Sequence, residues 1–222
     1  MTTGLAGKQI VVTGAGGALG GAVVEALSAA GATCHAPARD ELDLTDEAAV
    51  TAYYARLPPL WASVQVAGGY AGGPFVDTSA ADLRRQIDMN LTTCFLCCRE
   101  AVKSMTRASI AGGRISDGGG RIINIGSRAA LAPAGGSIAY SLSKAAVVAL
   151  TQCLADEVKG SRILVNAVIP SIIDTPANRA AMPSAHHDRW PKPAEIASAI
   201  TWLASPDNGL VSGALLPVYG VS

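Results

Sequence analysis

Three side chains in the second half of the chain have the types and spacing needed for proton transfer at a carbonyl group. Tyr140 and Lys144 are four residues apart in a stretch with helical periodicity, so they share one helix face. A free tyrosine, with a pKa of about 10, gives up its proton reluctantly near neutrality, but a neighbouring ammonium group favours the phenolate. Ser127 follows a strand-like stretch and can hydrogen-bond an oxygen on which negative charge develops. This trio predicts an acid–base centre for carbonyl reduction or alcohol oxidation.

Such a reduction also needs a hydride donor, and the start of the chain contains a turn suited to binding one. Residues 8–13 have the pattern of a buried strand, and a helix-like stretch begins at Ala18. Between them lie Gly14, Gly16 and Gly17, whose missing Cβ atoms let the backbone approach a pyrophosphate at the helix N-terminus. The alternative interpretation is a tight turn that binds no ligand.

The end of the second expected strand, residues 32–36, bears on the choice of nicotinamide cofactor. An acid there would hydrogen-bond the ribose 2′-hydroxyl of NAD, whereas an arginine would bind the 2′-phosphate of NADP. Ala38 occupies this position and Arg39 follows it, which favours NADP(H). NAD(H) is the alternative, because Asp40 is only one residue further along. Arg39 can also be read as an ordinary solvated charge.

The elements that would position these groups alternate along the chain. Short apolar, strand-like stretches at 61–66, 121–125, 162–168 and 213–218 are separated by stretches with helical periodicity. Such alternation implies a parallel sheet covered by helices, with ligands at the carboxyl ends of its strands. We therefore predict an α/β fold, a single doubly wound Rossmann-type domain over 1–222 with a mainly parallel sheet of about seven strands.

Local signals indicate where the helices begin. Thr45 can cap one helix, with acidic residues in its first turn. Ser79 followed by Asp82 resembles a capping box, and the helical stretch that starts there is expected to break near Asn90. The glycine-rich residues 111–120 are expected to form a surface turn.

Composition argues against several other classes of protein. The 222 residues include 17 basic and 17 acidic side chains, so net charge favours neither nucleic acid nor a membrane surface as a partner. No uninterrupted apolar stretch reaches the ~18 residues of a membrane-spanning helix. The start of the chain lacks a signal-peptide pattern, and an odd number of cysteines does not suggest a disulfide framework. We expect a cytoplasmic protein.

Two groups of residues invite a metal-binding interpretation that we do not favour. Cys94, Cys97 and Cys98 lie among apolar residues in a helix-like run, where free cysteine packs as a small apolar side chain. His186 and His187 are adjacent on a polar stretch, so their rings point in different directions, and no third ligand is evident. We expect no metal site.

Taken together, these motifs resemble the short-chain dehydrogenase/reductase family over essentially the whole chain. The first turn resembles the family's T-G-x-x-x-G-x-G pattern, with Ala18 in place of the middle glycine. GRIINIGSRAAL and AYSLSKAAV resemble its catalytic segment, and Met89-Asn90-Leu91 contains the match to its fourth catalytic residue. The resemblance implies hydride transfer between a nicotinamide and a small carbonyl or alcohol. Asn90 would then support a proton-relay water, and Lys144 would also hold the nicotinamide ribose.

The resemblance further implies a set of cofactor contacts, with two departures from the family pattern. Gln65 and Val66 stand where the family has two asparagines, and Ser171 stands where its nicotinamide-side segment has glycine. Segment 176–192 is the expected substrate lid. The implied cofactor contacts are Thr13, Gly14, Gly16, Gly17, Ala18, Leu19, Gly20, Arg39, Asp43, Leu44, Ala67, Gly68, Gly69, Asn90, Tyr140, Lys144, Pro170, Ile172 and Thr175.

Two other functions stay open at this point. Segments 66–73 and 174–183 resemble dihydropteridine reductase, which reduces a quinonoid pterin, although that enzyme lacks the serine present here as Ser127. A cofactor-binding sensor would keep the glycine turn and lose the tyrosine or the lysine, and this chain keeps both. The family resemblance also implies a homotetramer or homodimer packed through 91–106 and 138–158, with no nucleic-acid or membrane partner.

Overall fold

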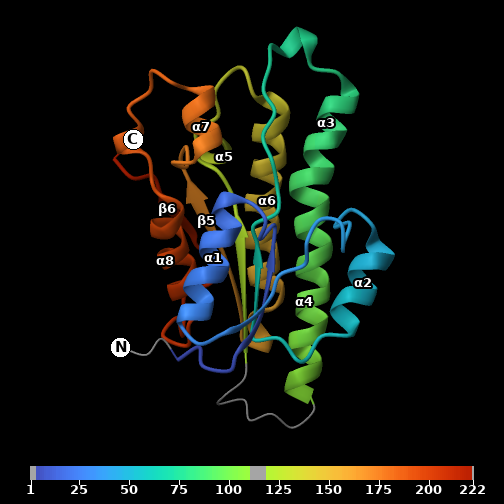
Figure 1. The fold of residues 1–222 in the computed structure, drawn as a ribbon. Helices are drawn as coiled ribbons and strands as arrows, with labels where there is room; N and C mark the ends of the chain where they lie inside the picture. Colours follow the sequence, from blue (N-terminus) through green and yellow to red (C-terminus); the bar gives the residue numbers. More distant parts are fainter. Residues whose placement is uncertain (1–3, 111–118, 222) are drawn as a thin grey trace.

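Six parallel strands form one sheet in the computed structural model of the protein, which describes residues 4–110 and 119–221 (Figure 1). Their spatial order is β2-β1-β3-β4-β5-β6. The prediction of a parallel, Rossmann-type α/β sheet is confirmed, but with six strands rather than about seven, because only six stretches of the described chain pair with one another. The strands are β1 (Gln9–Thr13), β2 (Thr33–His35), β3 (Ala62–Gln65), β4 (Gly120–Ile125), β5 (Ile163–Pro170) and β6 (Leu215–Val218).

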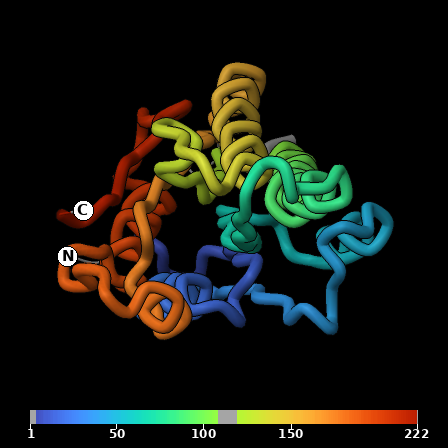
Figure 2. Tube along the Cα trace, turned by 90° about the horizontal axis from the view of Figure 1, so that it is seen from above, coloured from blue at the N-terminus to red at the C-terminus, as the bar shows by residue number. Residues whose placement is uncertain are grey.

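Helices cover both faces of this sheet (Figures 1 and 2). On one face lie α1 and α8, and on the other lie α2, α4 and α6. The α-helices are α1 (Ala18–Ala29), α2 (Glu47–Ala55), α3 (Ala80–Ile87), α4 (Thr93–Ile110), α5 (Arg128–Leu131), α6 (Ile138–Glu157), α7 (Pro176–Ala181) and α8 (Pro193–Ala204). Shorter turns are η1 (Phe75–Asp77), the π-helical η2 (Asp88–Thr92), η3 (Lys159–Ser161) and η4 (His187–Arg189).

Strand β1 shows why the strands of this sheet read as continuous apolar runs. Ile10 and Val12 pack in the core under α1 and α8, whereas Val11 between them packs in the core on the opposite face. Both faces are covered, so the four residues from Ile10 to Thr13 are all buried. The three cysteines of α4, Cys94, Cys97 and Cys98, belong to the second of these cores.

Helix α6 is the one helix in the described part of the chain that is long and apolar enough to cross a membrane by length and composition alone. It packs against β4 and β5, and its side chains Val147, Thr151 and Ala155 are buried. These contacts are those of a core helix, which passes the same test of length and composition.

The helix starts agree with the sequence at α3 and differ at α2. Ser79 and Asp82 form the predicted capping box at the start of α3. At α2 the cap is Asp46 rather than Thr45, because its carboxylate accepts hydrogen bonds from the N–H groups of Ala48 and Ala49, at 2.9 and 3.1 Å. Of the expected glycine-rich turn, residues 111–118 lie outside the described residues.

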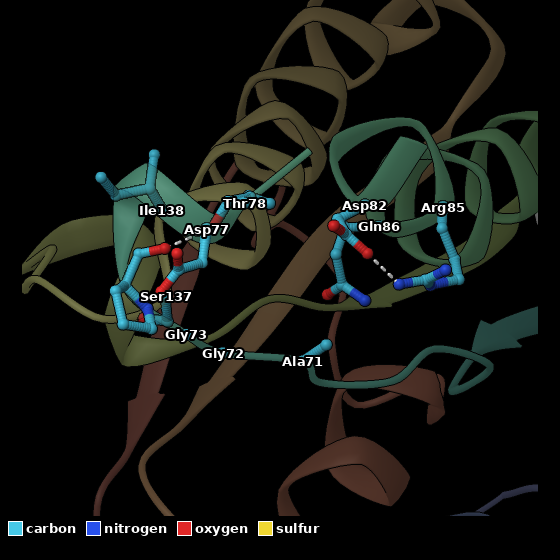
Figure 3. A pocket seen from close by; sticks show the side chains of 12 residues that line it. Ala71, Gly72, Gly73, Asp77, Thr78, Asp82, Arg85, Gln86, Ser137 and Ile138 are labelled. Carbon is cyan, nitrogen blue, oxygen red and sulfur yellow. Dashed lines mark hydrogen bonds and ion pairs between the residues drawn. The ribbon is translucent and has the colours of Figure 1, made fainter. Parts of the chain in front are cut away.

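A cavity of about 280 Å³ lies between the loop 71–74, α3 and the first residues of α6 (Figure 3). Its wall carries polar side chains, among them Asp82 and Arg85, which form an ion pair, and Gln86. Gln86 is 1% exposed, and its amide nitrogen has no hydrogen-bond partner among the residues that the structure describes. Neither Tyr140 nor Lys144 lines this cavity.

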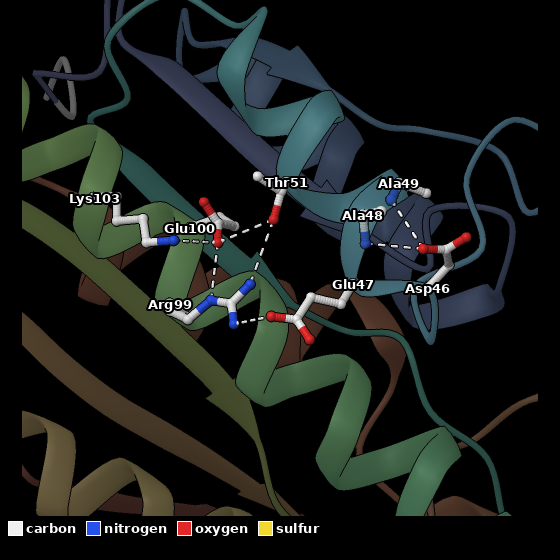
Figure 4. A network of polar contacts seen from close by, with 8 residues as sticks. All are labelled: Asp46, Glu47, Ala48, Ala49, Thr51, Arg99, Glu100 and Lys103. Atoms are coloured by element: carbon white, nitrogen blue, oxygen red, sulfur yellow. Dashed lines mark hydrogen bonds and ion pairs between the residues drawn. The ribbon is translucent and has the colours of Figure 1, made fainter.

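A buried carboxylate ties α2 to α4 (Figure 4). Glu100 is 4% exposed, and its Oε1 accepts hydrogen bonds from Arg99 Nε, Lys103 Nζ and Thr51 Oγ1 at 2.9, 2.8 and 3.3 Å. Burial alone would raise the pKa of Glu100, but the hydrogen bonds from Lys103 and Arg99 outweigh it and hold the pKa below its usual value. Because Thr51 belongs to α2, these contacts hold α2 against the middle of α4.

We expect Glu100→Gln to lower the free energy of unfolding at pH 7 by about 1 to 3 kcal/mol, because hydrogen bonds to a charged acceptor are lost. The folded-state pKa is depressed, so this stabilisation is present above the unfolded pKa of about 4.3 and is lost as pH falls through the folded pKa. Urea denaturation at pH 7 and at lower pH measures the difference, which should shrink on acidification. Glu157→Gln, at an exposed position of α6, is the control. Equal stability of Glu100→Gln and the parent at pH 7 would contradict the prediction.

Candidate active site

Tyr140 lies in the first turn of α6, and Ser127, just after β4, hydrogen-bonds its phenol group. The Ser127 oxygen also accepts the Ala129 N–H at 3.2 Å, which fixes the orientation of the hydroxyl at the start of α5. Burial raises the pKa of Tyr140 above its ordinary value, and the hydrogen bond from Ser127 offsets part of that rise. The two residues therefore meet at the carboxyl edge of the sheet, as their spacing suggested.

Lys144 is one helical turn further along α6 and is 6% exposed. Its Nζ donates a hydrogen bond of 2.9 Å to the carbonyl of Ile125, the last residue of β4. Burial lowers the pKa of Lys144 to about 8, so the amine is protonated in most molecules at neutral pH. The sequence predicts that Lys144 lowers the pKa of Tyr140, but burial of the phenol has the largest effect on this pKa, and the contribution that lowers it is the hydrogen bond with Ser127.

Asn90 lies in the π-helical turn η2, at the break expected in the long helical stretch. Its Oδ1 accepts the N–H of Gly69, and its Nδ2 donates to the Gly69 carbonyl, both at 3.0 Å. Nδ2 also lies 3.2 Å from the hydroxyl of Ser143, which in turn donates to the carbonyl of Tyr140 at 2.7 Å. Single π-helical turns occur frequently at functional sites. Asn90 thus joins the loop after β3 to α6.

The loop after β3 passes between these polar groups because it is made of glycine. A Cβ atom on Gly68 would lie 2.6 Å from Asn90 Oδ1 and 3.4 Å from Lys144 Nζ, and one on Gly69 would collide with Met89. Asn90 and Lys144 therefore flank the backbone at Gly68. The structure brings together the four residues that the sequence predicted for proton transfer, namely Asn90, Ser127, Tyr140 and Lys144.

The turn between β1 and α1 has the shape needed for a pyrophosphate. Gly17 precedes α1 as its N-cap, and neither a capping side chain nor an acidic residue in the first turn occupies the N–H groups. A Cβ on Gly16 would meet nothing within 4 Å, so there is open space above the turn. The methyl group of Ala18, the residue that departs from the family pattern, is exposed. Uncapped N–H groups beneath open space fit the phosphates of a dinucleotide.

Other glycines hold this turn against the rest of the sheet. Gly14 has a φ of +71°, and a Cβ there would lie 2.7 Å from the backbone nitrogen of Ala67. A Cβ on Gly20 would collide with the carbonyl of Gly14, so the helix can approach the turn only with glycine at this position. Leu19, which precedes Gly20 in α1, is buried in the core on this face of the sheet.

Gln65 supplies the polar support that the missing asparagines would have provided. Thr13 donates to its Oε1 at 3.3 Å, and its Nε2 donates to the hydroxyl of Ser63 at 2.8 Å. The Thr13 hydroxyl also accepts the N–H of Ala67 at 3.2 Å, so β1 and the loop after β3 are joined. The roles of Gln65 and Ser143 were not predicted from the sequence, although a polar residue within a buried strand or core helix is a usable signal.

The residues expected around the adenosine end lie on the exposed turn after β2. Arg39 is exposed, and its charge acts on Asp43, whose pKa is lowered chiefly by hydrogen bonds from Thr45. Leu44 packs partly against the core under α2 and α4. Arg39 and Asp43 are thus close enough to interact, and Arg39 extends from a solvent-facing position.

The expected lid follows Pro170, the last residue of β5. Ile172 is 42% exposed, and Thr175 caps α7 by accepting the N–H of Asn178 at 3.2 Å. Figures 1 and 2 both place α7 above the N-terminal end of α1, over the glycine turn.

His187 helps to fold the segment after α7. Its Nε2 lies 2.7 Å from the carbonyl oxygen of Met182, and its ring packs against Trp190. In the described ranges 4–110 and 119–221, no group of three or more His, Cys, Asp or Glu residues could hold a metal ion.

Gly20→Ala should weaken binding of nicotinamide cofactor at least about tenfold, because the added Cβ pushes α1 away from the Gly14 carbonyl and widens the turn. Cofactor fluorescence titration measures the dissociation constant. Gly21→Ala is the matched control: its Cβ would lie at an ordinary 3.6 Å from the Ala15 carbonyl. That control should bind normally and gain up to about 1 kcal/mol of stability from helix propensity. Unchanged affinity in Gly20→Ala would disprove this account of the turn.

Comparison with known proteins agrees with this arrangement of elements and residues. A family model described as enoyl-(acyl carrier protein) reductase matches residues 4–220. Galactitol 2-dehydrogenase of Rhizobium johnstonii is 35% identical, over 96% of this chain and 94% of its own length. Cis-4-hydroxycyclohexanecarboxylate dehydrogenase of Sinomonas cyclohexanicum is 34% identical, over 80% of this chain and 73% of its own.

The fold is also similar to solved structures. A short-chain type dehydrogenase/reductase from Mycobacterium ulcerans superposes with a TM-score of 0.87 at 25% identity. The superposition covers 98% of this chain and 90% of that one. Sequence and fold therefore point to the same family across nearly the whole chain.

Proposed function

Because this chain belongs to the short-chain dehydrogenase/reductase family and is an oxidoreductase of the nicotinamide-dependent kind, we propose that it interconverts a small carbonyl compound and its alcohol. The observation that carries the proposal is the convergence of Asn90, Ser127, Tyr140 and Lys144 beside the glycine turn. When bound, the cofactor supplies or accepts a hydride at the substrate carbon.

Tyr140 is the proposed general acid and base. In reduction its phenol donates a proton to the carbonyl oxygen as the carbon gains hydride, and in oxidation the phenolate takes the hydroxyl proton. Because burial raises the pKa of Tyr140, the phenol keeps its proton at neutral pH, which suits reduction. Ser127 stabilises negative charge on the oxygen that reacts. Lys144, with a pKa of about 8, is a proton source for regenerating the phenol.

We propose NADP(H) as the preferred cofactor, with NAD(H) as the alternative. The support is Arg39, which is exposed on the turn after β2 and follows the position where NAD-specific proteins carry an acid. A guanidinium can bind a 2′-phosphate through two parallel hydrogen bonds. The backbone at Ile172 would face the nicotinamide carboxamide and Thr175 the phosphates.

The remaining features of the proposal concern the whole protein. Residues 1–222 would act as one dinucleotide-binding domain, with 176–192 as the substrate lid. Exposed Phe95 and Leu142, on α4 and α6, support assembly into a homodimer or homotetramer through these helices. The five cysteines are free thiols, which suits the reducing cytoplasm.

Reduction of a quinonoid pterin is the second candidate. It is favoured by the loop 66–73, in which Tyr70 presents an exposed aromatic ring beside Tyr140. Ser127 argues for a carbonyl, because protonation of a ring nitrogen has little need of a hydroxyl that stabilises an oxyanion. A panel of carbonyl compounds and a quinonoid dihydropterin, each with NADPH and NADH, distinguishes the two.

Tyr140→Phe should reduce kcat at least about a hundredfold, the usual contribution of a general acid, while the dissociation constant for cofactor stays within twofold. Steady-state rates and cofactor fluorescence measure the two effects. Tyr53→Phe, on α2, removes a phenol away from the site and serves as the control. Full activity of Tyr140→Phe would disprove the proposed role of Tyr140 as general acid and base. Tight cofactor binding by the parent protein without turnover of any compound would favour the sensor.

Arg39→Ala should lower kcat/KM with NADPH by about tenfold or more and leave NADH-dependent rates nearly unchanged, because a charge-assisted hydrogen bond to the 2′-phosphate is lost. Rates with both cofactors at constant ionic strength measure the effect. Arg107→Ala, near the end of α4, changes net charge equally and is the control. A higher kcat/KM with NADH than with NADPH in the parent protein would overturn the proposed preference.

A further inference from the structure

We propose that Tyr70 is a substrate-contacting residue that makes the site selective for planar, ring-bearing carbonyl compounds over compact aliphatic ones. The inference rests on the proposed oxidoreductase function and adds to it a class of substrate. It concerns a residue in the loop after β3 that the acid–base chemistry itself does not use.

The first observation is the position of the Tyr70 ring. Its centroid lies 5.0 Å from that of Tyr140, with the two planes at 75°, an edge-to-face contact. Yet Tyr70 is 67% exposed, so most of its surface contacts no other part of the described protein. The charge of an ionised Tyr70 would raise the pKa of Tyr140, which also reflects how close the two phenols lie.

The second observation is that the backbone holds this exposed ring in place from both sides. Before it, Gly69 exchanges two hydrogen bonds with Asn90. After it, the Gly73 N–H donates to the carbonyl of Gly136 at 2.8 Å, which joins the loop to the turn before α6. A Cβ on Gly72 would collide with the Tyr70 hydroxyl, so the phenol lies against its own loop.

These contacts separate Tyr70 from an ordinary surface tyrosine. The loop is fixed to Asn90 and to the turn before Tyr140, so the ring is positioned relative to the reacting phenol. Little of the ring is buried, so burial of apolar surface gives it little stabilising role in the fold. A rigid ring with an accessible face is suited to stacking against another planar ring, at centroid distances of about 4.5 to 7 Å.

The position of the Tyr70 ring also limits which substrates can gain affinity by contacting it. A carbonyl oxygen hydrogen-bonded to Tyr140 and Ser127 leaves the rest of its molecule near the neighbouring Tyr70 ring. A planar ring bonded to the carbonyl carbon can reach that face, whereas a methyl group offers it little contact. Aromatic pairs contribute about 0.5 to 1.5 kcal/mol beyond buried area, which corresponds to roughly three- to tenfold in affinity.

The test compares three matched ketones: acetophenone, cyclohexyl methyl ketone and acetone. In Tyr70→Leu, the ratio of kcat/KM for acetophenone to that for acetone should fall roughly three- to tenfold, through KM. Tyr70→Phe, which keeps the ring, should keep the ratio. Phe75→Leu is the control, because Phe75 is as exposed as Tyr70 but lies on η1. Its ratio should match that of the parent.

Three results would overturn the proposal. An unchanged ratio in Tyr70→Leu would show that the ring does not contact substrate. An equal loss for acetophenone and cyclohexyl methyl ketone would show that Tyr70 offers apolar surface without selecting planar rings. A uniform fall in all rates, with a lower Tm and weaker cofactor binding, would assign Tyr70 a role in the loop alone and also contradict the proposal.

A binding measurement keeps this inference separate from the proposed function. Saturation-transfer NMR with cofactor present gives the affinity of acetophenone for the parent protein and for Tyr70→Leu, whether or not turnover occurs. Absence of turnover with every carbonyl compound would defeat the proposed function, while a three- to tenfold weaker affinity in Tyr70→Leu would still support the role of Tyr70. Equal affinities would reject that role even if the enzyme is active.

Discussion

The close approach of the backbone at Gly68 and Gly69 to Asn90 and Lys144 is the constraint on which the rest of the site depends. Asn90 uses both ends of its carboxamide on Gly69, and a Cβ on Gly68 would occupy the space between Asn90 and Lys144. Buried amide and ammonium groups need partners, because an unsatisfied one costs about 1 to 3 kcal/mol or more. The π-helical turn therefore supplies Asn90 as the partner of the loop backbone, and the loop can approach Asn90 this closely only with glycine at position 68.

That constraint explains how two buried titratable groups coexist at the edge of the sheet. Burial shifts the pKa of Tyr140 upward and that of Lys144 downward, so each shift favours the neutral form of its group. Hydrogen bonds from Ser127 to the phenol and from Lys144 to the Ile125 carbonyl moderate the cost of that burial. The fold thus holds a protonated phenol beside a lysine that can gain or lose a proton near neutrality.

Much of this arrangement could be predicted from sequence because it depends on local patterns. Helical spacing placed Tyr140 and Lys144 on one face, and the glycine turn after a strand indicated the N-terminus of α1. The helix cap at Asp46, the support from Gln65 and the ring contact of Tyr70 were not predicted. The cap at Asp46 is local, and the sequence offered Thr45 and Asp46 side by side as capping residues. The other two contacts depend on which groups meet in three dimensions, across 52 residues for Thr13 and Gln65, and spacing along the chain does not encode that. The sequence contains six strand-like stretches, and the described structure has six strands, so no stretch corresponded to the expected seventh strand.

The groups of the candidate site come from both faces of the sheet and meet at the carboxyl ends of its strands. The glycine turn begins α1 on one face, and α7 lies over the same end. Asn90 and Tyr140 come from helical segments on the other face, and the loop after β3 passes between the two sets. A change in that loop can therefore alter what reaches Tyr140 without altering the turn that would hold the pyrophosphate. Because binding residues on loops vary more freely than the scaffold beneath them, substrate choice in this protein should reside in Tyr70 and its neighbours rather than in the proton-transfer group itself.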